Sequence, residues 1–345
     1  MRIGITYDLK EAWLSSGYSL EETAEFDSLE TVQAIENALR SMGHQPVRIG
    51  GLDDLMTALC RGRSWDMVFN IAEGMHGFGR ESAIPAILDA RQIPYTFSDP
   101  LVLAVSLHKA TAKRVVRDCG LKTPRFIVVE TPLDLENAGL NYPVFAKPIA
   151  EGTGKGVDGQ SFIKTPEELE ATCRVLLAKH RQPVLVEEFL PGREFTVGIV
   201  GTGRNARVVG VMEVLVDSAY EGGNYGYENK AKYEDRVSYV LASGDEAEAS
   251  AQLALDSWLA LGCRDGGRVD VRMDSSDRPA FIEVNPLPGL HPVDSDLPIL
   301  CGLIGVSYDS LIEQIVNSAL DRVLDDPEVA LLLEELSAFE SENVA

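Results

Sequence analysis

Residues 267–298 read GRVDVRMDSSDRPAFIEVNPLPGLHPVDSDLP, and the organisation of the remaining chain follows from this segment. Its alternating composition predicts two strands, 268–273 and 280–285, joined by a polar loop of turn-forming residues. In a hairpin symmetric about that loop, one surface is wholly apolar, because it pairs Met273 with Ala280, Val271 with Ile282, and Val269 with Val284. We expect that surface to pack on a core.

The opposite surface of the predicted hairpin is largely polar, and its members are Arg268, Asp270, Arg272, Phe281, Glu283 and Asn285. The same register places Asp270 opposite Glu283, and Arg268 opposite Asn285. Like charges that face each other destabilise a sheet, so we expect a positive charge between the carboxylates. Two carboxylates and an amide form an oxygen-only donor set that suits Mg²⁺. A solvated outer face explains these strands equally well when they are taken alone.

Length and composition indicate a globular protein of several domains. A chain of 345 residues, 45% hydrophobic and 25% charged, is large enough for two or three domains at roughly 150 residues each. The formal net charge of −23 argues against binding to a nucleic-acid backbone, which requires a basic surface. The five cysteines are scattered without a CxxC pair, which favours reduced core thiols over disulfides or a zinc site.

The ends of the chain bear on location and assembly. The first residues, MRIGITYDLK, lack the apolar region of a signal peptide, and no later run reaches membrane-spanning length. We therefore expect a cytoplasmic protein that contacts neither nucleic acid nor membrane. The acidic segment 326–345 could form one more helix on a neighbouring domain or on a second subunit, which leaves a homodimer open.

The first hundred residues alternate between predicted strands and helices. Strands are expected at 3–7, 47–49 and 67–70, and helices at 31–42 and 52–60. This order predicts a small open parallel α/β sheet, whose ligands bind beyond the carboxyl ends of the strands. Two polar loops, 8–28 and 70–82, follow strand ends. In the first loop, Glu25 and Asp27 are candidates for ligand contact, and ordinary loop or N-cap roles fit them equally well.

The middle of the chain combines lysines with a glycine-rich turn. Lys109 lies on a helix expected at 106–119, and Lys147 ends an apolar strand where an apolar residue would be usual. A lysine in a cleft needs an anionic partner such as phosphate, although solvent-reaching side chains explain either lysine alone. The segment EGTGKGV, 151–157, lies between predicted strands and can fold over phosphates through its backbone amides. With the hairpin, these features indicate a site for Mg²⁺ and a nucleoside triphosphate.

Two apparent nucleotide motifs are rejected. GTGRNA at 201–206 matches a dinucleotide-binding pattern, but a strand follows it where a helix is required, so we expect a hairpin turn. Lys155 lacks the Ser or Thr that would follow it in a Walker A loop, so that motif is rejected as well.

The segment 217–235 is long and polar. A loop of this length inside a compact domain is expected to be a lid or a binding loop.

The order of these motifs resembles that of ATP-grasp enzymes, and among them the D-alanine–D-alanine ligases. The matching segments are VFNIAEG with GFGRESAIPAILDARQIPYTFSDP, LHKATAKRVVRDCGLKTPRF, YPVFAKPIAEGTGKGV, VLVEEFLPGREFTVGIVG, and GCRDGGRVDV followed by FIEVNPLPGL. They span residue 3 to about residue 320. The resemblance implies an α/β chain with an N-terminal open parallel domain before an ATP-grasp fold. The implied divisions are 1–100, two ATP-grasp subdomains at 101–186 and 187–320, and an acidic tail at 321–345.

The resemblance also implies a role for each motif. ATP phosphates would be contacted by Lys109 and Lys147 and covered by a loop containing Glu151, Gly152, Gly154 and Gly156. The adenine hinge would comprise Glu187, Glu188, Phe189 and Leu190, and Glu194 would hold the ribose hydroxyls. Two Mg²⁺ ions, with Mn²⁺ as an alternative, would be bound by Asp270, Glu283 and Asn285. Arg268 would stabilise the transferred phosphate and the tetrahedral intermediate.

The reaction implied by the resemblance joins small amino-acid-like substrates. ATP phosphorylates a carboxylate, and an amine then attacks the acyl phosphate to give an amide, ADP and phosphate. The metals and Arg268 would offset the charge on the transferring phosphoryl group. The glycine-rich loop and the long polar segment would exclude water, which would otherwise hydrolyse the acyl phosphate.

The chain departs from the ligase pattern at the implied catalytic positions. Glu25 or Asp27 stands where the ligases hold the first amino group, and Thr153 replaces a serine in the glycine-rich loop. In YENKAKY, Lys230 is the preferred match for the lid lysine and Lys232 is the alternative.

The acceptor region also departs from the pattern. Ser295 falls where the family binds the acceptor carboxylate, and Asp294 and Asp296 flank it, which favours an amine-bearing or cationic acceptor. A specialised amino-acid or peptide ligase therefore remains an alternative. A nucleotide-binding regulator that has lost catalysis is a second one.

Overall fold

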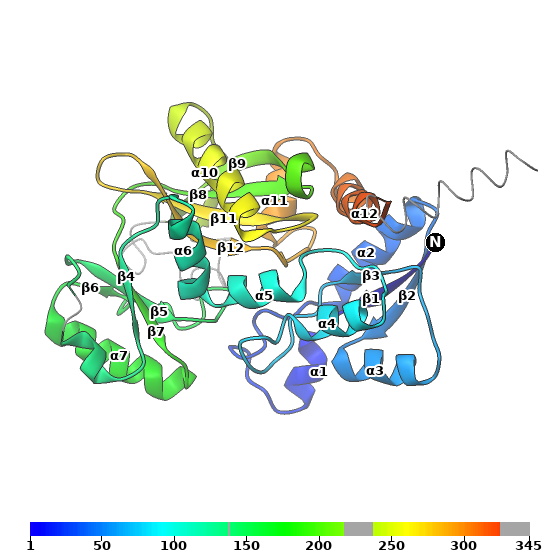
Figure 1. Cartoon of the computed structure of the whole chain (residues 1–345), viewed down its shortest axis with the longest axis horizontal. Coiled ribbons are helices and arrows are strands. Elements are labelled where there is room, and N and C mark those ends of the chain that lie inside the picture. The colour runs from blue at the N-terminus through cyan, green and yellow to red at the C-terminus, as the bar shows by residue number, and fades with distance from the viewer. Residues whose placement is uncertain (137–138, 217–236, 325–345) are drawn as a thin grey trace, which may run out of the picture.

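The protein is described here by a computed structural model that covers residues 1–136, 139–216 and 237–324. Three sheets lie next to one another, with helices on their outer faces (Figure 1). The mixed α/β architecture agrees with the fold class that the sequence predicts.

The first sheet is built from the N-terminal residues and has the strand order β2-β1-β3, with both pairs parallel, as predicted. Its strands are β1 (Arg2–Thr6), β2 (Gln45–Gly50) and β3 (Met67–Asn70). Its helices are α1 (Lys10–Ser15), α2 (Leu29–Ser41), α3 (Leu52–Cys60) and α4 (Ala83–Ala90). The predicted bounds of α3 and β3 are confirmed, whereas α1 and α4 are short helices that the apolar periodicity did not indicate.

The second sheet has the order β4-β7-β5-β6. Its strands are β4 (Phe126–Val129), β5 (Val144–Pro148), β6 (Phe162–Ile163) and β7 (Val184–Glu188), and α7 (Pro166–His180) covers it. Helix α7 is capped at its N-terminus by Thr165, whose side chain accepts a hydrogen bond from the Glu168 amide. Apolar residues of α7, including Leu169 and Cys173, pack on Val144 and Val186.

The third sheet is antiparallel and has the order β10-β9-β8-β11-β12. Its strands are β8 (Glu194–Val200), β9 (Arg207–Val216), β10 (Val237–Leu241), β11 (Gly266–Met273) and β12 (Pro279–Asn285). Helix α10 (Asp245–Leu261) packs on it through the fully buried Trp258. The GTGRNA segment forms the turn between β8 and β9, including the short 3₁₀ helix η2 (Gly203–Asn205), so the predicted hairpin turn is confirmed.

Two helices connect the first and second sheets. The helix predicted at 106–119 is present as α6 (Lys109–Asp118), but it begins later than expected, because a break at His108 separates it from the preceding helix α5 (Pro100–Leu107). The His108 side chain accepts a hydrogen bond from the Thr111 amide, 3.3 Å between Nδ1 and N, and so caps α6. After β4, the chain forms only a short 3₁₀ turn, η1 (Pro132–Leu135).

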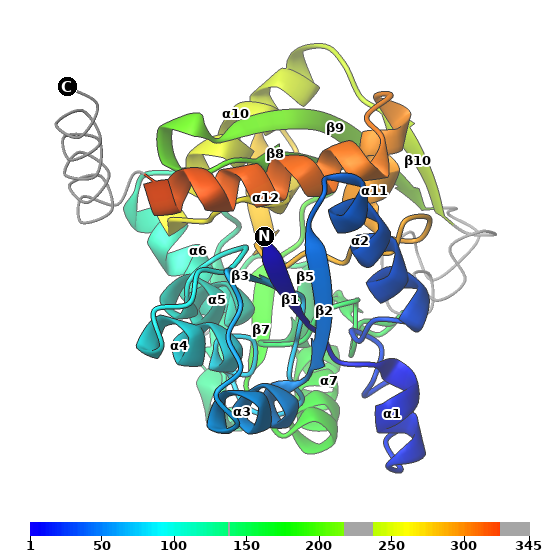
Figure 2. The ribbon, with the colours of Figure 1, turned by 90° about the vertical axis from the view of Figure 1, so that its right-hand side faces the viewer.

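The last described helices return to the beginning of the chain. Helix α11 (Asp296–Leu303) leads into α12 (Tyr308–Leu324), which lies across the first sheet beside α2 (Figure 2). Leu311 and Ile315 of α12 share one buried core with Ile3 and Ile5 of β1. No single described helix is long and apolar enough to cross a membrane, although the bent pair α11 and α12 would qualify by length and composition alone.

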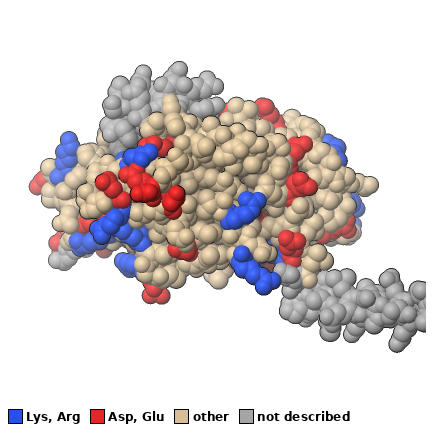
Figure 3. Space-filling view, turned by 90° about the horizontal axis from the view of Figure 1, so that it is seen from above, with Lys and Arg blue, Asp and Glu red and all other residues tan. Residues whose placement is uncertain are grey.

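Charges are mixed on the face shown in Figure 3. Lys and Arg side chains lie there in small groups between groups of Asp and Glu. Charged side chains at the surface of the described residues form ion pairs, such as Arg193 with Glu213 at 2.7 Å, and pairs of this kind contribute little to stability. The informative charges are therefore those buried between the sheets.

Candidate active site

The hairpin β11–β12 has the predicted pairing at its centre and a different one toward its turn. Asp270 lies opposite Glu283 and Arg268 opposite Asn285, as expected. A β-bulge after Asp270 then shifts the register, so Val271 faces Phe281 and not Ile282. The predicted pairs Val271–Ile282 and Met273–Ala280 are wrong for this reason.

Because of the bulge, two apolar side chains lie on the opposite faces of the hairpin from those that were predicted. Phe281, expected on the polar surface, is fully buried in the core, and Ile282 lines the cavity instead. The backbone carbonyl of Phe281 accepts hydrogen bonds from the Lys113 ammonium group (3.2 Å) and the Thr123 hydroxyl (2.9 Å). Those contacts hold Phe281 against α6. Ile282 is therefore the bulged residue, which has no partner opposite it on β11.

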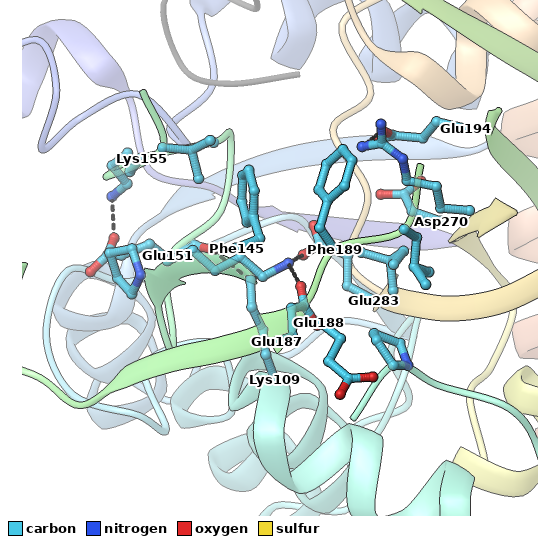
Figure 4. A pocket seen from close by; sticks show the side chains of 18 residues that line it. Lys109, Phe145, Glu151, Lys155, Glu187, Glu188, Phe189, Glu194, Asp270 and Glu283 are labelled. Carbon is cyan, nitrogen blue, oxygen red and sulfur yellow. Dashed lines mark hydrogen bonds and ion pairs between the residues drawn. The ribbon is translucent and has the colours of Figure 1, made fainter. Parts of the chain in front are cut away.

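A first cavity opens between the second and third sheets (Figure 4). The predicted nucleotide and metal residues that line it are Lys109, Lys147, Glu151, Gly154, Glu187, Glu188, Phe189, Leu190, Glu194, Asp270 and Glu283. Apolar side chains that were not predicted, Phe145, Val157 and Ile282, complete its walls. Phe189 is fixed by edge contact with Phe162, 4.7 Å between ring centroids, and by the Arg272 guanidinium over its ring. A slot with apolar walls and charged ends suits a flat ring that carries phosphates.

Buried charges alternate along the floor of this cavity. The Lys147 ammonium group lies 3.3 Å from Oε1 of Glu187 and 3.3 Å from Oε2 of Glu283, and Lys109 lies 3.5 Å from the same Glu283 oxygen. Burial alone would lower the pKa of Lys147, but Glu187 and Glu283 outweigh it and raise that pKa above its ordinary value. Lys147 therefore stays cationic in a place where a phosphate can meet it.

Lys113 is a further charged residue, which lies in the protein interior beneath the floor of the cavity and pairs with Glu187. Sequence reasoning placed it on the same helix as Lys109 without assigning a role, although the i, i+4 spacing puts both on one helical face. Its side chain is fully buried and forms an ion pair of 2.8 Å with Glu187. Burial lowers the pKa of Lys113 to about 8, while Glu187 opposes that shift. The pKa of Glu187 is itself below its ordinary value, because Lys113 and Lys147 outweigh its burial.

A second cavity, of about 210 Å³, adjoins the first. The predicted residues that line it are Glu25, Thr153, Gly152, Arg268, Asn285 and Ser295. Lys109, Glu151 and Glu283 line both cavities, so the two spaces meet at these side chains. Asp27, the alternative to Glu25, does not line this cavity.

Glu25 is held by three groups from distant segments. Its carboxylate accepts hydrogen bonds from the Arg80 guanidinium (3.0 and 3.1 Å) and from the Gly152 amide (2.6 Å), and it lies 2.8 Å from the Lys155 ammonium group. These contacts outweigh burial and hold the pKa of Glu25 below its ordinary value. Lys155, rejected as a Walker lysine, thus joins the glycine-rich loop to the N-terminal loop, together with Glu151 at 2.8 Å.

Two further carboxyl groups that the sequence did not indicate, Glu73 and Glu81, line the second cavity. Burial raises the pKa of Glu81 to about 7, with Arg80 opposing and Glu25 adding to the shift. Burial and the neighbouring Glu81 and Glu25 raise the pKa of Glu73 as well. Glu25, whose pKa is lowered, therefore shares the cavity with two carboxyl groups whose pKa values are raised.

Arg268 lies at the boundary between the hairpin and α11. It is buried and forms ion pairs with Asp270 and, at 3.3 Å, with Asp296. Asp296 therefore offsets the charge of Arg268 and does not simply add a negative charge to the acceptor region. Ser295 is the residue before α11, and its hydroxyl accepts a hydrogen bond from the His291 amide at 2.9 Å.

The glycine-rich loop depends on glycine where it turns. Gly154 and Gly156 have φ values of 70° and 72°, and a Cβ on Gly156 would lie 2.4 Å from Cγ of Pro148. Thr153, at φ 50°, turns the same loop into the second cavity. Lys230 and Lys232 lie outside the described residues, so their predicted roles stay predictions.

The oxygen donors of the hairpin fit a divalent cation in type. Asp270, opposite Glu283, also accepts a hydrogen bond from the Thr196 hydroxyl at 2.9 Å. Within the described parts of the chain, no three His, Cys, Asp or Glu side chains group closely enough to hold a metal ion. A cation here would therefore also need the amide oxygen of Asn285, phosphate or water.

Comparison with known proteins agrees with this arrangement. A family model described as D-ala D-ala ligase C-terminus matches residues 115–317. A D-alanine–D-alanine ligase of Bordetella petrii is 34% identical over 254 residues, which are 72% of this chain and 75% of that protein. The corresponding ligase of Bordetella avium is 33% identical over 299 residues, 85% of this chain and 90% of that protein. The crystal structure of a D-alanine–D-alanine ligase from Bacillus anthracis complexed with ATP covers 93% of this chain and 98% of its own, with a TM-score of 0.69 and 20% identity.

The fold and the two adjoining cavities define an ATP-dependent ligase with an ATP-grasp fold, which forms carbon–nitrogen bonds. Within that class, the chain belongs to the D-alanine–D-alanine ligase family. The resemblance inferred from the ordered motifs is therefore confirmed.

Proposed function

We propose that this ligase joins two small amino acids, with D-alanine as acyl donor and a second D-alanine as acceptor, in the manner named for its relatives. The observation that carries the proposal is the meeting of the two cavities at Lys109, Glu151 and Glu283. A phosphoryl donor in the first cavity and a carboxylate in the second would face each other there, and proximity of this kind removes a large entropic barrier.

The first cavity would hold ATP. Phe189, Leu190 and Ile282 would enclose the adenine, while Glu188 lies on the strand end whose backbone would read its edge, and Glu194 would bind the ribose. Lys109 and Lys147 would contact the phosphates, which would take over the contacts that Glu187 and Glu283 now make with those lysines. The loop that contains Gly152, Gly154 and Gly156 would cover them.

The hairpin would hold Mg²⁺, in two ions, through Asp270, Glu283 and Asn285, with Mn²⁺ as a substitute. Such ions supply compensation for the negative charge that gathers on phosphoryl oxygens during transfer. Arg268, which lies between Asp270 and Asp296, would bind the transferred phosphoryl group from the acceptor side.

The reaction takes place in two balanced steps. A carboxylate oxygen of the donor attacks the γ-phosphorus of ATP, and the bond to ADP breaks. The acceptor amine, in its neutral form, then attacks the acyl carbon of the acyl phosphate, phosphate leaves, and the nitrogen loses a proton. Glu25 would hold the donor ammonium group, and Thr153 and Ser295 would contact the substrates from the glycine-rich loop and from the start of α11. Lys230, or Lys232, would act from the segment outside the described residues.

A second candidate is a ligase for different amino acids or a peptide. It is favoured by the carboxyl groups of Glu73 and Glu81, which line the substrate cavity in addition to Glu25 and would accommodate a further amino group. The cytoplasm, where ATP and free amino acids are both present, is the compartment we propose in either case.

The two candidates are separated by product analysis. The protein is incubated with ATP, Mg²⁺ and pairs of amino acids, phosphate release is measured, and products are identified by mass spectrometry. D-alanyl-D-alanine as the preferred product supports the first candidate. Preference for a pair with a diamino acid supports the second, and tight ATP binding without turnover for any pair would contradict both.

A further inference from the structure

We propose that the hollow at the carboxyl ends of β1, β2 and β3 is a second small-molecule site, which binds a primary ammonium ion attached to a short apolar or aromatic body. The hollow measures about 510 Å³. Its walls come from the residues after β1 and β2, from α1, and from the segment 72–84. Open parallel sheets bind ligands at this end of their strands.

The apolar part of the wall is held rigidly. Trp13 of α1 lines the hollow together with Leu9, Ile49 and Ile84. The Trp13 ring is fixed by Tyr18, at 5.1 Å between centroids, and by Phe26, at 5.4 Å. An immobile indole face beside aliphatic side chains provides contact for an apolar body and a favourable surface for an attached cation.

The polar part of the wall is a buried carboxylate without a cationic partner. Asp8 is 8% exposed and accepts hydrogen bonds from the Gly74 amide (2.9 Å) and the Trp13 indole nitrogen (3.3 Å). Among the described residues, no Lys, Arg or His forms an ion pair with it. A buried carboxylate that is held only by neutral donors is costly, and an ammonium group would compensate its charge.

Space for that ammonium group lies beside Asp8. Gly51 lines the same hollow, and a Cβ at this position would lie 3.0 Å from Oδ1 of Asp8. The absence of a side chain on Gly51 thus leaves one side of the carboxylate open. Asp53 and Asp54 also line the hollow and add negative charge, while Arg80, on the same wall, is engaged by Glu25 and by the carbonyl of Ala150 at 3.0 Å.

The site is separate from the catalytic cavity but shares a wall with it. Glu73 and Glu81 line the substrate cavity, whereas their neighbours Gly74 and Arg80 line the hollow. A ligand in the hollow therefore contacts the opposite side of the segment that presents those carboxyl groups to the substrate. The excess of carboxylates over cations on the wall selects an amine over a carboxylate or phosphate ligand.

Calorimetric titration of the full-length protein with 2-phenylethylamine and with 2-phenylethanol, in the presence of saturating ATP and Mg²⁺, tests the proposal. The two probes differ by the charged group, so the amine should bind at least about tenfold more tightly at pH 7. Asp8→Asn, which keeps an acceptor for the Gly74 amide, should weaken amine binding by at least about tenfold. The matched control Glu170→Gln removes one exposed charge on α7 and should leave amine binding unchanged.

A second variant keeps the test decisive if Asp8→Asn does not fold. Ala12 is exposed on α1 and lines the hollow, so Ala12→Trp should block the hollow while ATP affinity stays at the wild-type value. Loss of amine binding in that variant supports the site. Equal affinity for the amine and the alcohol, or full amine affinity in Ala12→Trp, would overturn the proposal.

Discussion

Lys113 and Glu187 form an ion pair inside the protein, with 2.8 Å between Nζ and Oε2 and with side chains that are 0% and 6% exposed. Glu187 is also 3.3 Å from Lys147, which reaches Glu283 on the hairpin at 3.3 Å. A row of charges of alternating sign therefore runs from Lys113, on the buried face of α6, through Glu187 and Lys147 to Glu283 of the proposed metal site. A substitution at any residue of this row is therefore expected to change both the free energy of unfolding and the orientation of the Lys147 side chain.

Lys113→Met should destabilise the protein by about 3–5 kcal/mol, because it leaves the buried Glu187 with one cationic partner in place of two. The free energy of unfolding from urea titration measures this. Lys179→Met is the matched control, since Lys179 pairs with Glu21 at the surface, and it should cost about 0–1 kcal/mol. An equal loss of unfolding free energy in the two variants would contradict the prediction, because it would show that the buried ion pair contributes no more to stability than the surface pair does.

Asp270→Asn and Glu283→Gln should each reduce phosphate release by at least about 100-fold, because each removes a carboxylate from the proposed cation site. Turnover is followed with ATP and the preferred substrate pair, and removal of divalent cations with EDTA should abolish it in the wild type. Asp277→Asn, in the turn of the same hairpin, is the control and should retain wild-type turnover. Turnover of either site variant near the control value would exclude these carboxylates as metal ligands.

Glu25→Gln should raise the KM for the acyl donor by about tenfold or more and leave the KM for ATP unchanged. The amide keeps an acceptor for the Gly152 backbone but loses the charge that would hold an ammonium group. Initial rates with each substrate varied in turn separate the two constants. The control is Glu22→Gln, at an exposed neighbouring residue, which should alter neither KM. If Glu25→Gln raises only the KM for ATP, Glu25 contributes to nucleotide binding and not to binding of the acyl donor.

Asp27→Asn should change how stability depends on pH. Burial raises the pKa of Asp27 to about 7, with Asp8 adding to the shift and Thr31 opposing it. The folded protein therefore keeps a proton that the unfolded chain releases near its ordinary pKa, so this residue's contribution is present at low pH and is lost as pH rises toward about 7.

The difference in unfolding free energy, variant minus wild type, should accordingly increase between about pH 4 and pH 7 and level off above it. Denaturant titrations at several pH values measure it. Asp134→Asn is the control, because hydrogen bonds from Thr131 and Glu130 hold the pKa of this exposed carboxyl below its ordinary value. Its difference from wild type should stay flat over the same interval, and a flat result for Asp27→Asn would mean that Asp27 is ionised in the folded protein.

Sequence reasoning predicted the centre of the hairpin because charged and apolar residues alternate strictly from Arg268 to Val271. It failed at Phe281 and Ile282, since two adjacent apolar residues do not reveal which one faces the core. The outcome depends on Lys113 and Thr123, which bind the Phe281 carbonyl and are far away in sequence. Helix α5 was missed for a related reason, because an almost wholly apolar segment shows no helical periodicity.

The wall of the second cavity shows another limit of sequence-based prediction. Glu25 could be proposed from its loop, but its partner Arg80 is 55 residues away, and no local pattern joins them. Glu73 and Glu81 were part of quoted segments, yet their raised pKa values come from burial and from neighbouring carboxylates such as Glu25, which only the folded chain provides. Motif order was therefore sufficient for the family, and insufficient for the arginine and the carboxyl groups that surround Glu25.

Helix α12 contributes Leu311 and Ile315 to the core that also contains Ile3 and Ile5. During synthesis, β1 leaves the ribosome about three hundred residues before the helix that covers its sheet. The N-terminal sheet thus cannot complete its core as an independent early folding unit, which is the usual order for domains made in sequence. The apolar face of this sheet therefore stays exposed until α12 has been synthesised, so the N-terminal part of this ligase becomes fully folded only after that helix is available.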